Sequence, residues 1–339
     1  MKTRRVNRQW RLAAYPEGMP KVSDWVMVEQ AAPQAGRGEL LVRALVLDVA
    51  PSQRGRISRR DNYSSGVKPG DVMVGCAVGE VLASRAEGYL PGDIVVTDTS
   101  FGWQELSAIS ANAVRKIDLA LAPPACWLDF LGFNGATAYI GIKLVADVQA
   151  GDNVVVSAAA GSVGQIAGQV ARICGARPIA ITSGAEKVAH CLTLGYDAAV
   201  DYTAEIDLAE TIVKLCPEGV NVFFDNTAGP IHDAVMQNLA THARIALCGT
   251  VSLAARFDEV DLGQRFLREI LVARARLQGF LVVDYAHVFD QAWRELLSWY
   301  QSGQLNCRYD TLKGIENVPE AFLRLLTSKN IGKQVVDVT

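Results

Sequence analysis

The chain has 339 residues, of which half are hydrophobic and a fifth are charged. Because this length exceeds what a single hydrophobic core usually supports, we expect two domains and no large disordered region. The 33 lysine and arginine residues stand against 36 aspartate and glutamate residues, which gives a net charge of -3. Such a balance gives no general attraction to nucleic acid or to anionic membranes, so we expect a small-molecule partner.

Membrane spans, disulfide frameworks and zinc sites each have a characteristic sequence pattern, and none of these patterns is evident here. The sequence has no run of about 18 apolar residues, and its seven cysteines are scattered, so we expect a cytoplasmic protein with reduced thiols. There is no Cys-x-x-Cys pair, and the first histidine is His190. Because zinc needs several Cys, His or carboxylate ligands close together, we expect no metal.

Residues 25–117 are rich in short apolar runs separated by glycine and proline. The runs with strand-like spacing are 40–42, 44–46, 72–74, 78–82 and 94–96. Turns that contain Pro-Gly-Asp precede two of them, at 68–71 and 90–93. This part of the chain is therefore predicted to form a β-rich domain.

From residue 153 onward, strands are predicted to alternate with helices. Residues 153–157 suit a buried parallel strand, and apolar residues between Val163 and Cys174 recur at the spacing of one helix face. Further strand-like runs lie at 179–181, 198–200, 220–224, 245–248 and 277–283. Six strands with intervening helices predict an α/β fold with a doubly wound parallel Rossmann sheet.

The expected domain boundaries lie where the β-like pattern stops and where it returns. We predict that residues 126–302 form the Rossmann domain. Residues 334–338 are again strand-like, so residues 303–339 are expected to join residues 1–125 in the β-rich domain.

The segment that follows the strand at 153–157 carries a glycine pattern typical of dinucleotide binding. Gly161 would let the backbone approach a pyrophosphate, and Gly164 would let the helix pack closely on the strand. Ala159 stands where the first glycine of this motif often lies. A pattern between a buried strand and an amphipathic helix is much more specific than glycines alone, so we predict a dinucleotide site.

The choice between NAD and NADP depends on the end of the second strand, where an acidic residue would bind the ribose hydroxyls of NAD. No acidic residue follows Ile181 at the strand tip; Ser183 can donate a hydrogen bond, and Lys187 can reach a 2′-phosphate. These residues predict NADPH. The neighbouring Glu186 could instead bind the ribose.

Several segments, in the right order along nearly the whole chain, resemble the zinc-free medium-chain reductases of the leukotriene B4 dehydrogenase, or prostaglandin and alkenal reductase, family. They include Asn7-Arg8-Gln9-Trp10, Arg54-Gly55-Arg56, Phe101-Gly102-Trp103, Val155 to Gly164, Phe224-Asp225-Asn226 and Lys329-Asn330-Ile331-Gly332-Lys333. The resemblance implies a GroES-like catalytic domain built from both termini, a Rossmann domain between them, and a homodimer. It also implies NADPH-dependent reduction of a carbon–carbon double bond conjugated to a carbonyl group.

The resemblance carries a set of cofactor contacts onto matching positions of this chain. They are Gly161, Val163, Gly164, Lys187, Tyr202, Asn226, Cys248, Phe280, Val282 and Asn330. Tyr202 and Asn226 also follow predicted strand ends, where ligands of such sheets bind, although Tyr202 could equally pack and Asn226 could cap a turn.

The substrate side departs from the family pattern. The two tyrosines that the family places there are replaced by Ser52 and Ala254. We expect a wider pocket, formed by Ser52, Phe133 and Ala254, that could accept bulky or aromatic enones, because a buried aromatic ring covers about 150–250 Å². The candidates for the group that stabilises the developing enolate are Ser52, Tyr63 and Tyr285.

Two other functions remain open from the sequence. One is an NADPH-dependent quinone or carbonyl reductase on the same scaffold. The other is a cofactor-binding protein without catalysis, because a Rossmann fold alone does not establish chemistry.

Overall fold

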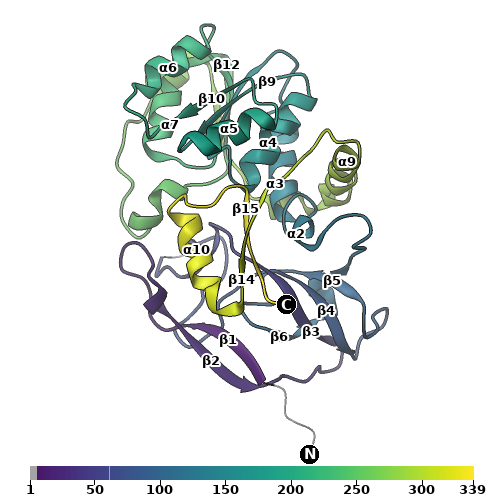
Figure 1. Ribbon diagram of the computed structural model, residues 1–339. Helices are drawn as coiled ribbons and strands as arrows, with labels where there is room; N and C mark the ends of the chain where they lie inside the picture. Colours follow the sequence, from purple (N-terminus) through teal and green to yellow (C-terminus); the bar gives the residue numbers. More distant parts are fainter. Residues whose placement is uncertain (1–5, 61) are drawn as a thin grey trace, which may run out of the picture.

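The computed structural model describes residues 6–60 and 62–339 (Figure 1). The start of the predicted β-rich domain, residues 1–5, lies outside these residues. Among the described residues, no helix is both long enough and apolar enough to cross a membrane.

The lower part of the molecule in Figure 1 is β-rich. Its seven-stranded sheet has the order β14-β15-β3-β4-β5-β7, and β6 also pairs with β3. The strands are β3 (Glu39–Asp48), β4 (Ala77–Ser84), β5 (Ile94–Thr97), β6 (Leu106–Ser110), β7 (Val114–Lys116), β14 (Tyr309–Lys313) and β15 (Lys333–Asp337). A separate antiparallel pair is formed by β1 (Val6–Leu12) and β2 (Trp25–Ala31).

The end of the chain returns to this β-rich part. β15 pairs antiparallel with β3, with Val335 opposite Asp48, and β14 pairs parallel with β15. Residues of β15 are buried almost completely, and α10 (Val318–Leu326) contacts this strand. The C-terminal strands β14 and β15 therefore belong to the same sheet as β3 from the first part of the chain.

The upper part contains a six-stranded parallel sheet with helices around it (Figure 1). The strands are β8 (Asn153–Ser157), β9 (Arg177–Thr182), β10 (Ala198–Asp201), β11 (Val220–Asp225), β12 (Leu239–Leu247) and β13 (Arg276–Gly279). Their order, β10-β9-β8-β11-β12-β13, is that of a doubly wound dinucleotide-binding sheet, which confirms the predicted fold class.

Helices cover both faces of this sheet. They are α3 (Phe133–Ile140), α4 (Ser162–Ile173), α5 (Ala185–Thr193), α6 (Leu208–Leu215), α7 (Gly229–Val235), α8 (Leu267–Ala273) and α9 (Phe289–Gln301). The side chains of Val154 and Val156 point to one core and that of Val155 to the other, and all three are fully buried. Burial on both faces explains why the β8 sequence is a continuous apolar run and not an alternating one.

The predicted sixth strand is shorter than its apolar run. The run at 277–283 is a strand only as far as Gly279, and residues 282–288 form a 3₁₀ helix. Val282 and Tyr285 pack against the core beneath α3 and α9, so the second half of the run is used for helical packing. A short apolar run alone does not distinguish these two outcomes.

Candidate functional site

The turn between β8 and α4 has the geometry of a phosphate-binding turn. Ala158 has a φ of +48°, and Gly161 is the N-cap residue of α4. A Cβ atom on Gly164 would lie 2.3 Å from the carbonyl oxygen of Ala158, so only glycine lets the helix come this close to the turn. The free N–H groups at the start of this 12-residue helix, together with the helix dipole, favour an anion at this place.

The C-terminal segment closes over this turn. The backbone N–H of Gly332 donates to the carbonyl oxygen of Ala160 at 2.7 Å, and Gly332 forms a bridge with Gly161. Asn330 is buried, and its Nδ2 donates to the carbonyl oxygen of Gly332 at 2.8 Å. The β-rich part therefore supplies one wall of the dinucleotide site.

Lys187 lies at the edge of the same site with its ammonium group surrounded by uncharged oxygens. Its Nζ donates to the carbonyl oxygen of Ser328 at 2.6 Å, to Ser328 Oγ at 2.8 Å and to Ser183 Oγ at 3.4 Å. The side chain is buried, and this burial lowers the pKa of the ammonium. A buried cation with only neutral partners is suited to bind an anion such as a 2′-phosphate.

Glu186, the alternative ribose ligand, is engaged elsewhere. Its carboxylate forms an ion pair of 2.9 Å with Arg308, and its side chain is 70% exposed. Ser328, in contrast, is a hydrogen-bond partner of Lys187 that the sequence analysis missed. Ser328 directly precedes the Lys329 to Lys333 segment, but no local pattern connects it with Lys187.

The other predicted cofactor residues follow the carboxyl ends of neighbouring parallel strands. Ser183 follows β9, Tyr202 follows β10, Asn226 follows β11, Cys248 follows β12, and Phe280 follows β13. Because these strands are parallel, the residues lie along the sheet edge where ligands of doubly wound folds bind. Val163 is partly buried in the first turn of α4, and Val282 packs against the core next to Phe280.

Two of these residues have well-defined surroundings. The side-chain amide of Asn226 donates to the carbonyl oxygen of Ser157 at 2.7 Å, which joins the ends of β11 and β8. Burial raises the pKa of Cys248 to about 12, so its side chain is a neutral thiol at physiological pH. Tyr202 remains 39% exposed, and only its backbone is tied to the sheet, through Thr182.

Asp225 organises the loop that carries Asn226, a role that sequence reasoning missed. Its side chain is fully buried and accepts hydrogen bonds from Ser157 Oγ at 3.0 Å and from the N–H groups of Thr227 and Ala228 at 2.9 and 3.0 Å. His232 Nδ1 lies 2.9 Å from its other oxygen. A carboxylate with this many donors holds the strand end in one conformation.

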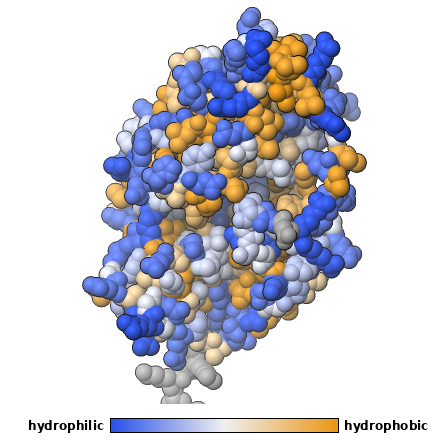
Figure 2. Space-filling view, turned by 180° about the vertical axis from the view of Figure 1, so that it is seen from behind, coloured by the Kyte–Doolittle hydropathy of each residue, from blue (hydrophilic) through white to orange (hydrophobic). Residues whose placement is uncertain are grey.

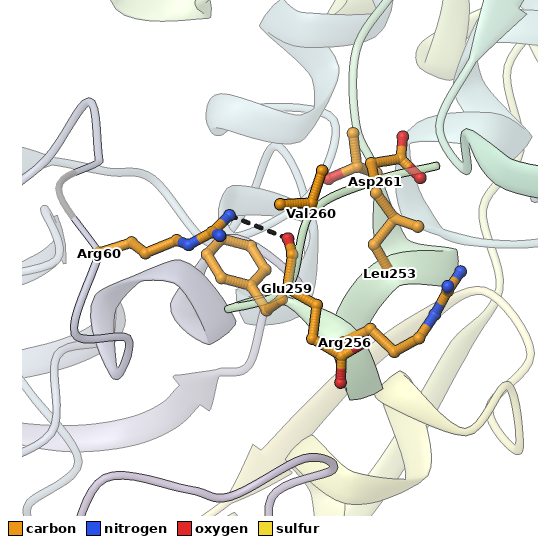
Figure 3. A pocket seen from close by; sticks show the side chains of 8 residues that line it. Arg60, Leu253, Arg256, Glu259, Val260 and Asp261 are labelled. Atoms are coloured by element: carbon orange, nitrogen blue, oxygen red, sulfur yellow. Dashed lines mark hydrogen bonds between the residues drawn. The ribbon is translucent and has the colours of Figure 1, made fainter. Parts of the chain in front are cut away.

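A cavity of about 200 Å³ lies between two loops, one from each part of the molecule (Figure 3). Its lining residues are Arg60, Thr250, Leu253, Arg256, Phe257, Glu259, Val260 and Asp261. Arg60 Nη1 donates to the carbonyl oxygen of Glu259 at 2.9 Å, which joins the two loops. Thr250 lies two residues after Cys248, so the cavity adjoins the sheet edge described above.

The three predicted pocket residues lie in different environments. Ser52 is exposed at the start of α1 (Gln53–Arg56). Phe133 is 37% exposed, and its ring packs edge-on against Phe289 at a centroid distance of 6.0 Å. Ala254 is 3% exposed and packs in the core of the β-rich part, whereas its neighbour Leu253 lines the cavity.

The hydroxyl candidates also separate in the structure. Tyr63 borders a second hollow next to the cavity, together with Arg60, Asn62 and Ser64. Its side chain remains 58% exposed, although desolvation raises the pKa of the phenol. Tyr285 is half-buried against the core of the Rossmann part. Of the three candidates, Tyr63 alone is among the residues that line these two hollows.

The side chains do not provide a zinc site within residues 6–60 and 62–339. No group of three or more His, Cys, Asp or Glu side chains is arranged there to hold a metal ion. Zinc in proteins needs three or four such ligands, so these residues do not fit that ion.

Comparisons with known proteins agree with this architecture. Residues 8–117 match a family described as the N-terminal domain of oxidoreductase, and residues 162–302 match one described as zinc-binding dehydrogenase. The NADPH-dependent curcumin reductase of Escherichia coli is 36% identical, with 98% of this chain and 97% of that protein covered. The NADP⁺-dependent 2-alkenal reductase of Nicotiana tabacum is 33% identical, with 98% of each chain covered.

A solved structure extends the comparison to three dimensions. The crystal structure of CurA from Vibrio vulnificus in complex with NADPH superposes with a TM-score of 0.92. The two chains are 34% identical, and the match covers 98% of this chain and 99% of the other.

Proposed function

Because this chain belongs to the zinc-free medium-chain dehydrogenase/reductase family of alkenal and prostaglandin reductases, we propose that it is an NADPH-dependent enone reductase. Its substrates are α,β-unsaturated aldehydes and ketones, and the product is the saturated carbonyl compound. The observation that carries the NADPH part is the buried Lys187 ammonium, whose bonded oxygens are all uncharged.

The residues of the Rossmann part would hold the cofactor. The glycine turn and the start of α4 bind the pyrophosphate through backbone N–H groups. Lys187, Ser183 and Ser328 would bind the 2′-phosphate, and charge-assisted hydrogen bonds to the phosphate oxygens would favour NADPH over NADH. Tyr202, Asn226, Cys248, Phe280, Val282 and Asn330 complete the proposed contacts.

The chemical step requires little from protein side chains. Bound NADPH supplies a hydride to the double bond. The protein orients the substrate in the cavity and provides a proton for the developing enolate. Tyr63 is the favoured donor because it alone of the three candidates lines the hollow next to the cavity, with Ser52 and Tyr285 as alternatives.

The cavity wall favours large substrates. Leu253, Phe257 and Val260 present apolar surface, whereas Ser52 and Ala254, which replace the family tyrosines, are not among the residues that line the cavity. A bulky or aromatic enone can bury its ring against the apolar side chains. Residues 1–125 and 303–339 are proposed as the catalytic domain, and residues 126–302 as the cofactor domain.

The activity is tested by following NADPH oxidation with a panel of small alkenals, aromatic enones, quinones and saturated aldehydes. We expect turnover with enones and a saturated carbonyl product. Turnover restricted to quinones or saturated aldehydes would identify the alternative reductase. NADPH binding without turnover of any panel member would indicate a non-catalytic protein.

We further propose a cytoplasmic homodimer. All seven cysteines are free thiols, which is typical of a reducing compartment. Among the described residues, β13 pairs only with β12, so one edge of the Rossmann sheet is open to pair with a second copy. Leu267, Leu271 and Val272 on α8 are 64–75% exposed, and Leu277 on β13 is 41% exposed.

Apolar side chains also gather over the upper, Rossmann part of the molecule in Figure 2. Covering exposed apolar surface of this kind stabilises association. Light scattering is expected to give twice the mass of one 36.5 kDa chain. A single-chain mass at micromolar concentration would contradict the dimer.

A further inference from the structure

We propose that Arg54 is a positioning residue that sets substrate binding by fixing the cavity-lining segment 250–261 across the two parts of the molecule. This inference rests on the proposed reductase function. Arg54 belongs to α1 in the β-rich part, whereas segment 250–261 follows β12 of the Rossmann part. Neither the cofactor contacts nor the candidate proton donors include Arg54.

The guanidinium group of Arg54 is buried against this segment. Its Nε donates to the carbonyl oxygen of Ala254 at 2.9 Å, and its Nη2 lies 3.6 Å from the Asp258 carboxylate. The guanidinium carbon lies 5.1 Å from the centre of the Phe257 ring. Nη2 also donates to the carbonyl oxygen of Gly18 at 3.2 Å, which ties the same group to its own domain.

The segment that Arg54 holds bridges the two parts of the molecule. At one end, Ser252 Oγ donates to the carbonyl oxygen of Thr227 in the Rossmann part at 2.6 Å. In the middle, Ala254 packs in the core of the β-rich part. At the other end, Ser58 Oγ donates to the Asp258 carboxylate. The segment is therefore anchored to both parts of the molecule.

Arg54 makes this bridge at an energetic cost. Its side chain is 3% exposed, and desolvation lowers the pKa of the guanidinium. Its Nη1 is buried without a hydrogen-bond partner among the described atoms. Burying a cation with incomplete partners is energetically costly, so the burial of Arg54 at this place favours a specific role over simple space filling. The planar fork presents two different nitrogens, Nε and Nη2, to Ala254 and Asp258 in a fixed geometry that a lysine ammonium lacks.

The consequence concerns the substrate and not the cofactor. The residues that line the cavity include Leu253, which directly precedes Ala254, and Phe257, which directly precedes Asp258. Both are therefore next to residues that Arg54 contacts. The glycine turn at 158–164 and the Lys187 cluster make none of the hydrogen bonds or ion pairs described for Arg54. Release of the segment should weaken substrate binding while NADPH binding stays unchanged.

The test compares Arg54→Lys with Arg244→Lys in the full-length protein. Arg244 is a matched control because its half-buried guanidinium also bonds a main-chain carbonyl oxygen, that of Asp147, and a carboxylate, that of Asp152. These partners precede the start of β8, at the sheet edge opposite the cofactor turn. Steady-state kinetics with an aromatic enone, NADPH titration and amide hydrogen exchange of residues 251–258 are measured for each variant.

For Arg54→Lys we expect an increase in KM of about tenfold or more, as for loss of one charge-assisted hydrogen bond, with kcat changed less than about threefold. NADPH affinity should stay within about twofold, and exchange at 251–258 should accelerate. Arg244→Lys should leave KM and exchange in this segment unchanged. A KM for Arg54→Lys equal to that of wild type, with or without faster exchange, overturns the proposal.

A second variant covers the case in which Arg54→Lys does not fold. Asp258→Asn removes the carboxylate that faces Arg54. It should also raise KM, by a smaller factor than Arg54→Lys does. An Asp258→Asn variant with wild-type KM would then overturn the proposal. If wild-type protein turns over no enone, the proposed function fails, whereas faster exchange in either variant still shows that Arg54 anchors the segment.

Discussion

Lys187 Nζ lies 2.6 Å from the carbonyl oxygen of Ser328, although 141 residues separate them in the sequence. The contact joins α5 of the Rossmann part to the loop between α10 and β15 of the β-rich part. Both parts of the molecule thus contribute to the proposed 2′-phosphate site. The preference for NADPH over NADH can therefore be tested by substitutions at Lys187 in one part and at Ser328 in the other.

The first prediction concerns the lysine. Lys187→Ala should weaken NADPH binding by about tenfold to a hundredfold, because a charge-assisted phosphate contact contributes about 1.5–3 kcal/mol. NADH binding should change little, since NADH has no 2′-phosphate. Fluorescence titration with both cofactors measures the effect, and Lys214→Ala, which removes an exposed lysine paired with Glu210, serves as the control. An equal loss for NADPH and NADH would contradict the assignment.

The second prediction concerns the serine on the other side. Ser328 has a φ of +56°, a backbone region that Asp and Asn adopt more readily than most residues. Ser328→Asp should place a carboxylate beside Lys187, repel the 2′-phosphate and lower the NADPH-to-NADH affinity ratio by at least about tenfold. Ser328→Asn has nearly the same size without the charge and should have a much smaller effect. If both variants behave alike, electrostatic repulsion is not the cause.

The third prediction separates two adjacent residues. Leu253 lines the cavity, so Leu253→Tyr should raise KM for bulky aromatic enones and leave that for small alkenals nearly unchanged. Ala254 is 3% exposed in a packed core, so Ala254→Tyr should lower the free energy of unfolding by about 1–3 kcal/mol through overpacking. Kinetics with both substrate sizes and urea denaturation measure the two effects. A fully stable Ala254→Tyr protein with altered substrate choice would instead place Ala254 in the pocket.

The fourth prediction uses a buried carboxyl group below the cofactor turn. Burial raises the pKa of Asp129 to about 6, although hydrogen bonds from Ser162 and Gln165 favour the ionised form. Because the folded pKa is higher than the unfolded one, the contribution of Asp129 to stability is full below about pH 4 and is lost as the pH rises through about 6. The loss should approach about 3 kcal/mol for a shift of this size.

This effect is measured as the difference in unfolding free energy between wild type and Asp129→Asn from pH 4 to pH 7. The difference should shift in favour of the variant as the pH rises and level off above about pH 7. The exposed Asp118→Asn serves as the control and should give a profile parallel to that of wild type. Parallel profiles for Asp129→Asn as well would show that this carboxyl group titrates normally.

The fifth prediction concerns metal content. Elemental analysis of dialysed protein should find far less than one zinc per chain, because the described residues offer no suitable set of ligands. A stoichiometric zinc content that survives dialysis would refute this prediction. Chelator treatment should likewise leave the melting temperature unchanged.

The sequence determined the features that depend on neighbouring residues. The apolar run of β8, the turn with Gly161 and Gly164 and the apolar face of α4 lie within about 20 consecutive residues. Strand and helix periodicities, together with the steric freedom of glycine, are properties of such short segments. The parallel sheet then followed from the repeated alternation of strands and helices, and it placed Lys187 in the first turn of α5, just beyond the end of β9.

Only the tertiary structure decided which distant segments meet. The partner of Lys187 is Ser328, and the contact between Arg54 and Ala254 joins residues 200 positions apart. The tertiary structure also ends β13, the last strand of the Rossmann sheet, at Gly279. It buries Ala254 in the core of the β-rich part, whereas Leu253 faces the cavity. These outcomes depend on how two separately patterned domains dock, and docking is governed by packing and hydrogen bonding between surfaces that no local periodicity records.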